Sequence, residues 1–449
     1  MTRKAAPLRI LPGGGLRIGY VMDAGAPDVR PPASSGPARH VRAVIEGLGR
    51  LGHDVRLLAR WDDGLWVSDD LAVFRAVGVP ALDAGFPRLA ERAIRRTQRQ
   101  LRAPYVGWFD SRRFAAACTR ELSGVDVIYE RLGWMGLGGR LAARAFGVPH
   151  VLEVNGDHLF ELDAQGMAPG GLQRRVSLRL MGRLARDAAW TIATGPGWRD
   201  RHVERWGVNP ATVSVVPNGT EMLDHLARGD LRCFGRASDD GPLRVIFAGA
   251  FDAWQGLPVI LRATARARML GADLTLTLAG SGPLEAEVRD LVSSLSLGSV
   301  VTLAGHLSPG ALADRLRESD VGVAAYCGRG EYSGLKLLDY KAAGLAVVTT
   351  GRDGRPAEIA DGRTGLVVLE NDAYGLAGAL ARCAADRSLT RRFGAAARAE
   401  AEARHAWRET ARQVGRRLSA VVAARPRRAP ARPAPATSAR AAGISVRQG

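Results

Sequence analysis

The chain has 449 residues, of which 46% are hydrophobic and 24% charged, so it can bury a full core in each of two or three domains. No run of about 18 apolar residues occurs, which argues against a membrane-spanning helix. Residues 1–15 lack the apolar stretch of a secretion signal, and a cytoplasmic protein is expected. The four cysteines include no C-x-x-C pair, which argues against structural disulfides and a zinc site.

Positive charge dominates the composition, with a formal net charge of +18. Much of the excess lies at the two ends. Residues 425–449 contain six arginines and no acid in a Pro/Ala-rich sequence, and residues 1–15 are also basic. Such segments bury too little apolar surface to fold, so both are expected to be disordered. The net charge therefore gives no reason to expect nucleic-acid binding.

The first half of the chain alternates short apolar strands with helices. Residues 16–22 are predicted to be a strand, and residues 41–48 an amphipathic helix, because their apolar side chains recur at helical spacing. Gly52 ends that helix, and 54–58 is the next expected strand. A unit of this length predicts a parallel strand pair with a crossover helix. Further strands are expected at 126–129, 150–154, 189–194 and 213–216.

A second series of the same kind follows a polar, turn-rich segment at 229–241, which is expected to be a linker. Its strands are predicted at 243–248, 274–279, 300–303, 321–325 and 346–350. Ala/Arg-rich helices from about 372 to 424 are expected to cover the second sheet. The pattern predicts an α/β fold with two Rossmann-like, doubly wound domains, 16–228 and 242–424, that face each other across a cleft.

The most informative stretch is 331–344, EYSGLKLLDYKAAG, which follows a strand and opens a helix. Ser333 can cap that helix, and Gly334 allows close backbone approach. The free N–H groups of a helix N-terminus suit a diphosphate, and Lys336 adds a full charge in the first turn. One turn on, Asp339 could accept both hydroxyls of a ribose. The alternative is an ordinary amphipathic helix with a salt bridge.

The same stretch resembles the donor motif of glycosyltransferase family 4, a retaining group with the GT-B fold. The motif is usually two glutamates separated by seven residues, and here Glu331 and Asp339 stand in those places. Further resemblances occur in the family's order along roughly residues 16–400. They are Gly36 with His40, GHDV at 52–55, YER at 129–131, LEVN at 152–155, VPNG at 216–219, Gly249 with Trp254 and Gly256, AGSGP at 279–283 and Gly305-His306.

The resemblance implies a retaining transfer of a hexose-type sugar from a nucleoside diphosphate donor to an acceptor hydroxyl. The C-terminal domain would hold the donor and the N-terminal domain the acceptor. No cofactor is expected, and no metal, since the chain has no D-x-D triplet. The implied catalytic residues are Glu331, Asn155 and Lys336. Asp339, Ser333, Gly334, Leu335, Gly249, Gln255, Gly280, Gly282 and Gly305 would bind the donor. Gly36, His40 and His158 would form the acceptor side.

Two departures keep other functions open. Many family members carry an arginine and a lysine where this chain has the neutral Ala250 and Gln255. A non-catalytic sugar-nucleotide or partner-binding member of the fold is one alternative, and a sugar-nucleotide epimerase is another. A dinucleotide-dependent oxidoreductase is not expected, because no G-x-G-x-x-G follows the first strand. The donor base, the sugar and the acceptor, whether glycolipid, polysaccharide or small molecule, stay open.

A basic segment in the first half suggests a second kind of partner. Residues 87–113 hold eight arginines against Glu91 and Asp110, with aromatic and aliphatic side chains among them, and 173–186 is also arginine-rich. Such a surface can lie on anionic lipid headgroups. Peripheral contact with the inner face of a membrane is therefore one interpretation, and a solvated helix face is the other.

Overall fold

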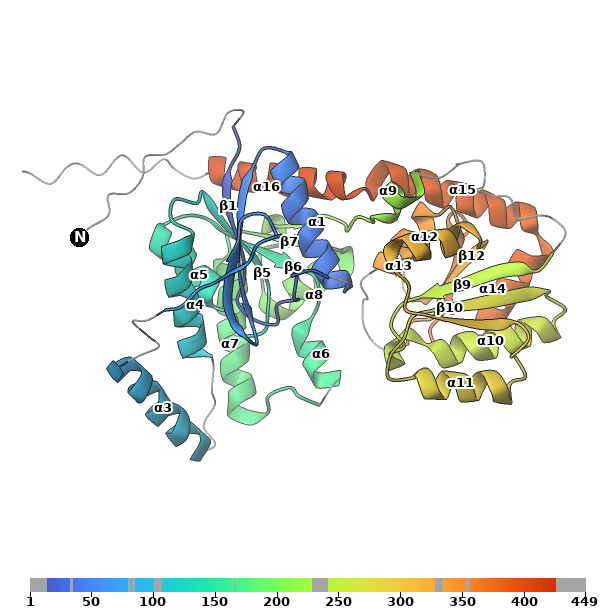
Figure 1. Ribbon diagram of the computed structural model, residues 1–449, viewed down its shortest axis with the longest axis horizontal. Helices are drawn as coiled ribbons and strands as arrows, with labels where there is room; N and C mark the ends of the chain where they lie inside the picture. Colours follow the sequence, from blue (N-terminus) through green and yellow to red (C-terminus); the bar gives the residue numbers. More distant parts are fainter. Residues whose placement is uncertain are drawn as a thin grey trace, which may run out of the picture.

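The computed structural model describes residues 14–32, 35–79, 82, 85–100, 107–164, 166–227, 241–327, 334–352 and 356–424. Two α/β domains lie side by side along the long axis of the molecule (Figure 1). Each contains one sheet with helices on both faces, and the expected α/β class with two parallel-sheet domains is confirmed. The expected linker at 229–241 and the two basic ends lie almost wholly outside the described residues.

The first domain is built on an eight-stranded sheet in the order β4-β3-β2-β1-β5-β6-β7-β8. All neighbours are parallel except β2–β3 and β3–β4, which are antiparallel. The strands are β1 (Arg17–Met22), β2 (Asp54–Trp61), β3 (Gly64–Ser68), β4 (Arg75–Ala76), β5 (Val127–Arg131), β6 (His150–Val154), β7 (Trp190–Ala193) and β8 (Val213–Val215). The strand order reverses direction between β1 and β5, and ligands bind at such switch points in open α/β sheets.

Helices of the first domain pack on this sheet through apolar stripes. Helix α1 (Gly36–Arg50) begins at Ser35, whose hydroxyl accepts a 3.3 Å hydrogen bond from the amide of Ala38, and its buried face includes Val41 and Val44. The other helices are α3 (Gly85–Gln100), α4 (Trp108–Glu121), α5 (Gly138–Phe146), α6 (His158–Ala164), α7 (Gly171–Asp187) and α8 (Pro196–Trp206).

The second domain has a six-stranded, wholly parallel sheet in the order β11-β10-β9-β12-β13-β14. Its strands are β9 (Leu243–Ala248), β10 (Leu274–Ala279), β11 (Val301–Gly305), β12 (Val321–Ala324), β13 (Ala346–Gly351) and β14 (Gly365–Leu369). Its helices are α10 (Leu257–Met269), α11 (Glu285–Ser294), α12 (Pro309–Arg317), α13 (Leu335–Ala342), α14 (Ala373–Ala385) and α15 (Arg387–Arg404). Here the switch point lies between β9 and β12, so its crevice opens at the carboxyl ends of these strands.

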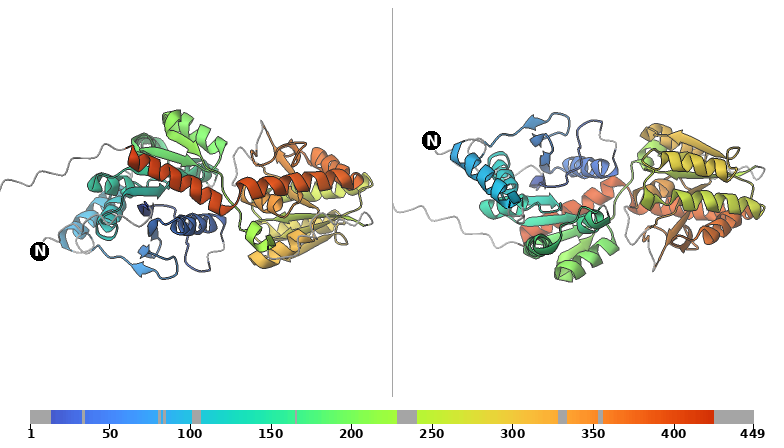
Figure 2. Two further views of the ribbon diagram at one scale, coloured as in Figure 1. Left: turned by 90° about the horizontal axis from the view of Figure 1, so that it is seen from above. Right: turned by 90° about the horizontal axis from the view of Figure 1, so that it is seen from below.

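The chain crosses between the domains twice, and each crossing ends in a helix that packs on the other domain. Helix α9 (Met222–Ala227) follows the first domain in sequence but contacts α12 and α13. Helix α16 (Trp407–Ala423) follows α15 but runs back along the first domain, where it lies against α1 (Figures 1 and 2).

This crossing corrects the expectation that the helices up to residue 424 cover the second sheet. Helix α16 joins the first core because Val414 and Leu418 are buried in it. Gly47 of α1 makes the approach close, since a Cβ at that position would lie 2.5 Å from the Cβ of Ala411. Among the described helices, none combines the length and apolar composition needed to cross a bilayer.

Candidate active site

The carboxyl edges of the two sheets face a common cleft of about 1670 Å³. Both domains line it, so a ligand that fills it would contact both sheets. The residues expected at the site that line this cleft are Gly36, Asn155, His158, Gly249, Gln255, Gly280, Leu335, Lys336 and Asp339.

Glycines at the ends of β9 and β10 form the floor of the second domain's half. A Cβ on Gly280 would lie 1.9 Å from the carbonyl oxygen of Gly249, and one on Gly282 would lie 2.8 Å from the amide nitrogen of Phe251. Gly249 itself has φ +155°, and Gly280 has φ +151°. Any side chain would therefore push the two loops apart. The glycines leave bare backbone at the edge of the cleft, as close approach of a ligand requires.

Lys336 lies above this floor, in the first turn of α13. Its ammonium group is 4.4 Å from the ring centroid of Phe247 and 5.4 Å from that of Tyr326, with Trp254 at 5.9 Å. It also donates a short hydrogen bond to Oε1 of Gln255. Burial lowers the pKa of Lys336 to about 7, although the charge of Asp252 opposes the shift.

Within the described part of the chain, the structure shows no ion pair that neutralises Lys336. Aromatic faces and one amide oxygen stabilise an ammonium less than a carboxylate does. The side chain is thus a partly buried cation at the N-terminal end of a helix, where the helix dipole adds further positive potential. An anion is the ligand that such a place favours.

The beginning of α13 also joins the two domains. A Cβ on Gly334 would lie 2.4 Å from Oε1 of Glu358, so any larger residue there would require the Glu358 side chain to move. The next residue, Leu335, reaches across to the first domain, where its Cδ1 would lie 3.1 Å from a Cβ on Gly36. The start of α1 and the start of α13 therefore meet at the cleft.

Asp339 lies one turn beyond Lys336 on the same helix and lines the cleft although it is only 7% exposed. Burial raises its pKa to about 6, against the lowering effect of the Arg39 guanidinium and of a 2.6 Å hydrogen bond from Thr220. Arg39 in turn forms a 2.5 Å ion pair with Glu221. The carboxylate is thus held by groups from α1 and from the interdomain crossing.

The first domain's wall is organised by Glu153, a buried carboxylate at the end of β6. It accepts hydrogen bonds from Arg131 (3.1 Å) and Tyr20 (3.2 Å), and a short one from the amide of Asn155. Burial alone would raise its pKa, but the charges of His40 and Arg131 outweigh that effect and hold the pKa well below its usual range. Arg131 and Asn155 line the cleft, so Glu153 fixes two of its walls.

His40 differs from the expected acceptor-side role. It is 4% exposed, and its ring nitrogens lie 3.0 Å from Oε1 of Glu153 and 2.8 Å from Oδ1 of Asn218. Both nitrogens are therefore occupied inside the protein, and His40 is not among the described residues that line the cleft. His158 does line the cleft, with Nε2 2.7 Å from the carbonyl oxygen of Leu132.

The remaining expected residues have other positions. Gly305 accepts a 2.7 Å hydrogen bond from the amide of Gly280 and so supports the floor. Glu331 and Ser333 lie outside the described residues. No group of three or more His, Cys, Asp or Glu side chains in the described ranges is arranged to hold a metal ion.

Sequence reasoning missed several side chains that shape the site. The rings of Phe247 and Tyr326 around Lys336 come from β9 and from just after β12, 89 and 10 positions away in the sequence. Arg39 and Thr220 approach Asp339 from the first domain and the crossing. The only local signal was that Thr220 directly follows the VPNG stretch.

Two family models match the chain in succession. The model described as "Glycosyl transferase 4-like domain" matches residues 35–219, and the one described as "Glycosyl transferases group 1" matches residues 234–400. Together they account for more than three quarters of the sequence, one in each domain.

Curated relatives carry glycosyltransferase names. The chain is 29% identical to a D-inositol 3-phosphate glycosyltransferase of Pseudarthrobacter chlorophenolicus over 54% of its own length and 58% of that protein. It is 28% identical to a protein of the same name from Stackebrandtia nassauensis, over 64% of its length and 66% of that protein. A glycogen synthase of Mycobacterium tuberculosis is 26% identical over 55% of this chain and 57% of that protein. The match thus spans less than two thirds of each of these relatives.

Solved structures show the same fold over nearly the whole chain. Sucrose-phosphate synthase from Thermosynechococcus elongatus superposes with a TM-score of 0.65 at 21% identity, covering 91% of this chain and all of that one. The Anabaena protein HepE in complex with UDP superposes with a TM-score of 0.65 at 14% identity, covering 90% of this chain and 100% of that one. The two successive domain matches and the shared two-domain architecture lead to one conclusion: the chain belongs to glycosyltransferase family 4 and has the GT-B fold.

Proposed function

We propose that this protein transfers a sugar from a nucleoside diphosphate donor to an acceptor hydroxyl, with retention of the anomeric configuration. The observation that carries the proposal is Lys336, a partly buried cation at the N-terminus of α13 with no ion-pair partner in the described residues. A diphosphate supplies the charge that this place lacks. Asp339, one turn further on, is suited to the ribose of the same ligand.

The chemistry of the transfer explains why such a cation is useful. The bond between the anomeric carbon and the diphosphate oxygen breaks, a bond from the anomeric carbon to the acceptor oxygen forms, and the acceptor hydroxyl loses its proton. Negative charge accumulates on the departing diphosphate. Lys336 and the N–H groups at the start of α13 stabilise that charge as it develops. Because these groups supply the positive charge, we expect transfer to proceed without a divalent metal.

The acceptor would enter from the first domain. Asn155 and His158 line that side, and Glu153 fixes the position of Asn155. Glu331, whose place in the motif implies contact with the donor sugar, stays a prediction because it lies outside the described residues. Retention is proposed from the resemblance of the donor motif to that of a retaining family.

The comparisons suggest which substrates to test first. HepE binds UDP and UDP-glucose in its structures, so uridine diphosphate sugars are our first donors. Two relatives are named for D-inositol 3-phosphate and one for glycogen, so inositol phosphates and α-glucans are our first acceptors. We keep the cytoplasm as the proposed location.

The first experiment is a thermal-shift screen with uridine, guanosine and adenosine diphosphates in the presence of a chelator. A ligand at about 100 times its dissociation constant adds roughly 2.7 kcal/mol of stability. We expect one nucleotide to raise the melting temperature of the wild type and to have little effect on Lys336→Ala and Asp339→Ala. If no nucleotide has an effect, the donor-site assignment is wrong.

A second experiment separates transfer from the alternatives. The protein is incubated with the sugar of the nucleotide that binds, with and without candidate acceptors, and released nucleoside diphosphate is measured. Acceptor-dependent release, with a product of unchanged anomeric configuration by NMR, supports retaining transfer. Binding without release identifies a non-catalytic binder, and conversion of the donor sugar to its epimer without an acceptor identifies an epimerase.

A further inference from the structure

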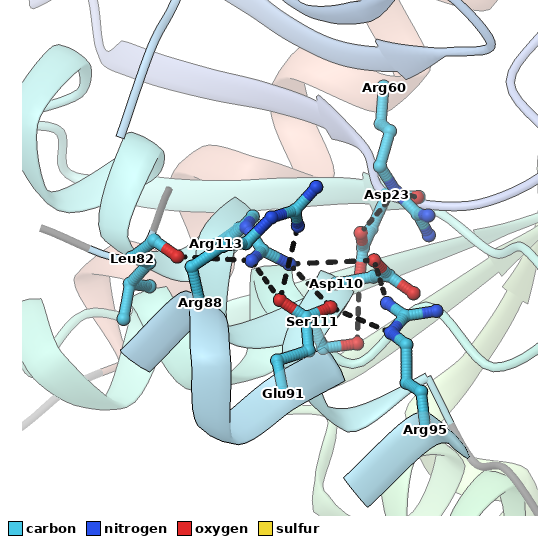
Figure 3. Close-up of polar contacts among 9 residues, drawn as sticks. All are labelled: Asp23, Arg60, Leu82, Arg88, Glu91, Arg95, Asp110, Ser111 and Arg113. Carbon is cyan, nitrogen blue, oxygen red and sulfur yellow. Dashed lines mark hydrogen bonds and ion pairs between the residues drawn. The ribbon is translucent and has the colours of Figure 1, made fainter. Parts of the chain in front are cut away.

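Helix α3 is held to the first domain by its polar face. Glu91, at the middle of the helix, is only 2% exposed, and the guanidinium groups of Arg113, Arg95 and Arg88 surround it (Figure 3). Arg95 donates to Oε1 at 2.7 Å and Arg88 to Oε2 at 3.3 Å, while Arg113 contacts both oxygens. The hydrogen bonds from Arg113 are the largest influence that lowers the pKa of Glu91 to about 2.

The same cluster connects α3 to its neighbours. Arg95 also reaches Asp110 of α4 at 3.0 Å, and Arg113 of α4 donates to the carbonyl oxygen of Leu82 at 3.1 Å (Figure 3). The side of α3 that carries Glu91 and Arg95 is therefore turned toward α4. Ion pairs shared among several groups fix an orientation better than isolated surface pairs do.

The opposite face of α3 is apolar and exposed to solvent. Phe86 is 81% exposed, Leu89 61% and Ile94 46%. With 100° per residue, Phe86 and Leu89 lie 140° or more from Glu91 around the helix, and Ile94 lies at the flank. A surface helix of a globular protein normally buries its apolar stripe and exposes its charges. Helix α3 does the reverse, so its apolar stripe lacks a partner within the described protein.

Arginines border this stripe. Arg92 and Arg96 are exposed, and no carboxylate in the described residues forms an ion pair with them in the structure. At the start of α4, Trp108 is 48% exposed, with the guanidinium of Arg112 5.3 Å from its ring. Figure 1 shows α3 at the outer edge of the first domain, on the side away from the second domain. The surface is thus separate from the donor half of the cleft.

We propose that α3 lies in the surface of a bilayer that contains anionic lipids, with Phe86, Leu89 and Ile94 among the acyl chains and Arg92 and Arg96 at the headgroup phosphates. An exposed apolar stripe with flanking arginines is the pattern of helices that lie in a membrane interface. Charge also argues against a second copy of this chain as the partner. Two such faces would bring Arg92 and Arg96 of each copy against those of the other.

A second part of the same surface supports this orientation. The turn before α7 and its first residues expose Met167 (62%) and Leu172 (63%), and Arg175 and Arg179 are exposed on the same helix. In Figure 1, α3 and the N-terminal part of α7 both project from the lower side of the first domain. A bilayer along that side would contact both.

The test is partition of the full chain onto sucrose-loaded vesicles, measured by sedimentation at low salt. We expect binding to vesicles that contain phosphatidylglycerol and little binding to phosphatidylcholine alone. Phe86→Ser with Leu89→Ser should lower the partition coefficient at least about tenfold. Arg92→Gln and Arg96→Gln should each lower it roughly fivefold. These side chains are exposed, so the variants should melt like the wild type.

The matched control is Met269→Ser with Leu270→Ser at the end of α10, where two side chains are exposed to 83% and 61% in the second domain. It removes similar apolar surface and should bind vesicles like the wild type. The full chain is used throughout, because the arginines in 425–449 also attract anionic lipids and contribute equally to every variant. The proposal is overturned by a wild type that binds neither vesicle, by α3 variants that bind as well as the wild type, or by variants that change only self-association.

Discussion

The hydroxyl of Thr220 donates a 2.6 Å hydrogen bond to Oδ1 of Asp339, across 119 positions of sequence. Thr220 stands where the chain first crosses between the domains, and its amide donates to the carbonyl oxygen of His405 at the second crossing, at 2.8 Å. The carboxylate proposed to hold the donor's ribose is therefore bonded to the segment where the chain first crosses between the domains. Thr220 therefore connects the proposed ribose-binding carboxylate, through its hydroxyl, with the second crossing, through its amide.

Replacing Thr220 by valine removes the hydroxyl and keeps the shape. The carboxylate of Asp339 then loses a donor, and the amide of Met222 loses its 2.9 Å acceptor, so nucleotide affinity should fall about fivefold, or ~1 kcal/mol, and the protein should lose roughly 1–2 kcal/mol of stability. Titration calorimetry and urea unfolding measure the two effects. Thr220→Ser keeps the hydroxyl and should behave like the wild type. Equal affinity in the valine variant would show that Asp339 does not depend on this bond.

Lys336→Met tests the proposed diphosphate site. Methionine fills a similar volume among the rings of Phe247 and Tyr326 but carries no charge, and loss of a charge-assisted contact of about 1.5–3 kcal/mol should weaken nucleotide binding roughly 10- to 100-fold. Gln255→Leu keeps the charge of Lys336, so it should weaken nucleotide binding less than Lys336→Met does. Titration calorimetry at one pH compares the three proteins.

The same variant should change how stability depends on pH. The pKa of Lys336 is lowered to about 7 in the folded protein, so the unfolded chain binds this proton more tightly. Stability of the wild type should therefore gain from this group as pH rises from about 7 to about 10, and Lys336→Met should lack that gain. Melting temperatures at pH 7 and pH 9 measure the difference. If the melting temperatures of the wild type and Lys336→Met change equally between pH 7 and pH 9, the pKa of Lys336 is not lowered.

Nucleotide affinity should be greatest between about pH 6 and pH 7. Asp339, with its pKa raised to about 6, is protonated below that pH and then accepts hydroxyl hydrogen bonds poorly. Lys336 loses its charge above about pH 7. A bound diphosphate raises the pKa of the lysine again, so binding near pH 8 should take up a proton, which calorimetry in two buffers of different ionisation enthalpy detects. A flat affinity from pH 5 to pH 9 would argue against both assignments.

Much of the fold could be predicted because its signal is local. Strands and helices alternate along the chain, and within each one the apolar residues recur at the period of that element. This pattern predicts two doubly wound domains, and the structure has two such sheets. The position of α16 could not be predicted in this way. Its apolar stripe, with Val414 and Leu418, suits either sheet, and the complementary feature is Gly47, more than 360 positions earlier.

The same contrast between local signals and contacts of distant segments applies to the candidate site. Lys336 and Asp339 could be predicted to lie one turn apart because both are on one short helix, where spacing alone sets their relation. The inward turn of Glu91 on α3 was not found, because its reason is Arg113 on another helix. His40 was assigned to the acceptor side because it lies in the glycine loop region, yet Glu153 and Asn218 hold it inside. Contacts between distant segments decide which face of a helix is functional.

Glu153→Gln tests the buried network behind the acceptor wall. The substitution keeps the shape but removes the charge that Arg131 and His40 face, and breaking a buried pair costs about 3–5 kcal/mol. We expect a loss of about 3 kcal/mol in urea unfolding at pH 7. The folded pKa of Glu153 lies below its unfolded value, so its contribution is present above about pH 4.3 and is lost as pH falls below that. The difference between variant and wild type should therefore narrow toward pH 3.

Glu130 of β5 provides the matched control. It is as deeply buried as Glu153 and lies 2.6 Å from Nε2 of His150, but burial outweighs the histidine and raises its pKa. Because its pKa is raised, ionisation of Glu130 lowers the stability of the folded state as pH rises. The pH dependence of its contribution therefore has the opposite sign to that of Glu153. Glu130→Gln should cost less stability at pH 7, and its cost should not shrink in acid. If both variants lose stability equally and with the same pH dependence, then Glu153 contributes by packing alone, and its charge does not fix the positions of Arg131 and Asn155.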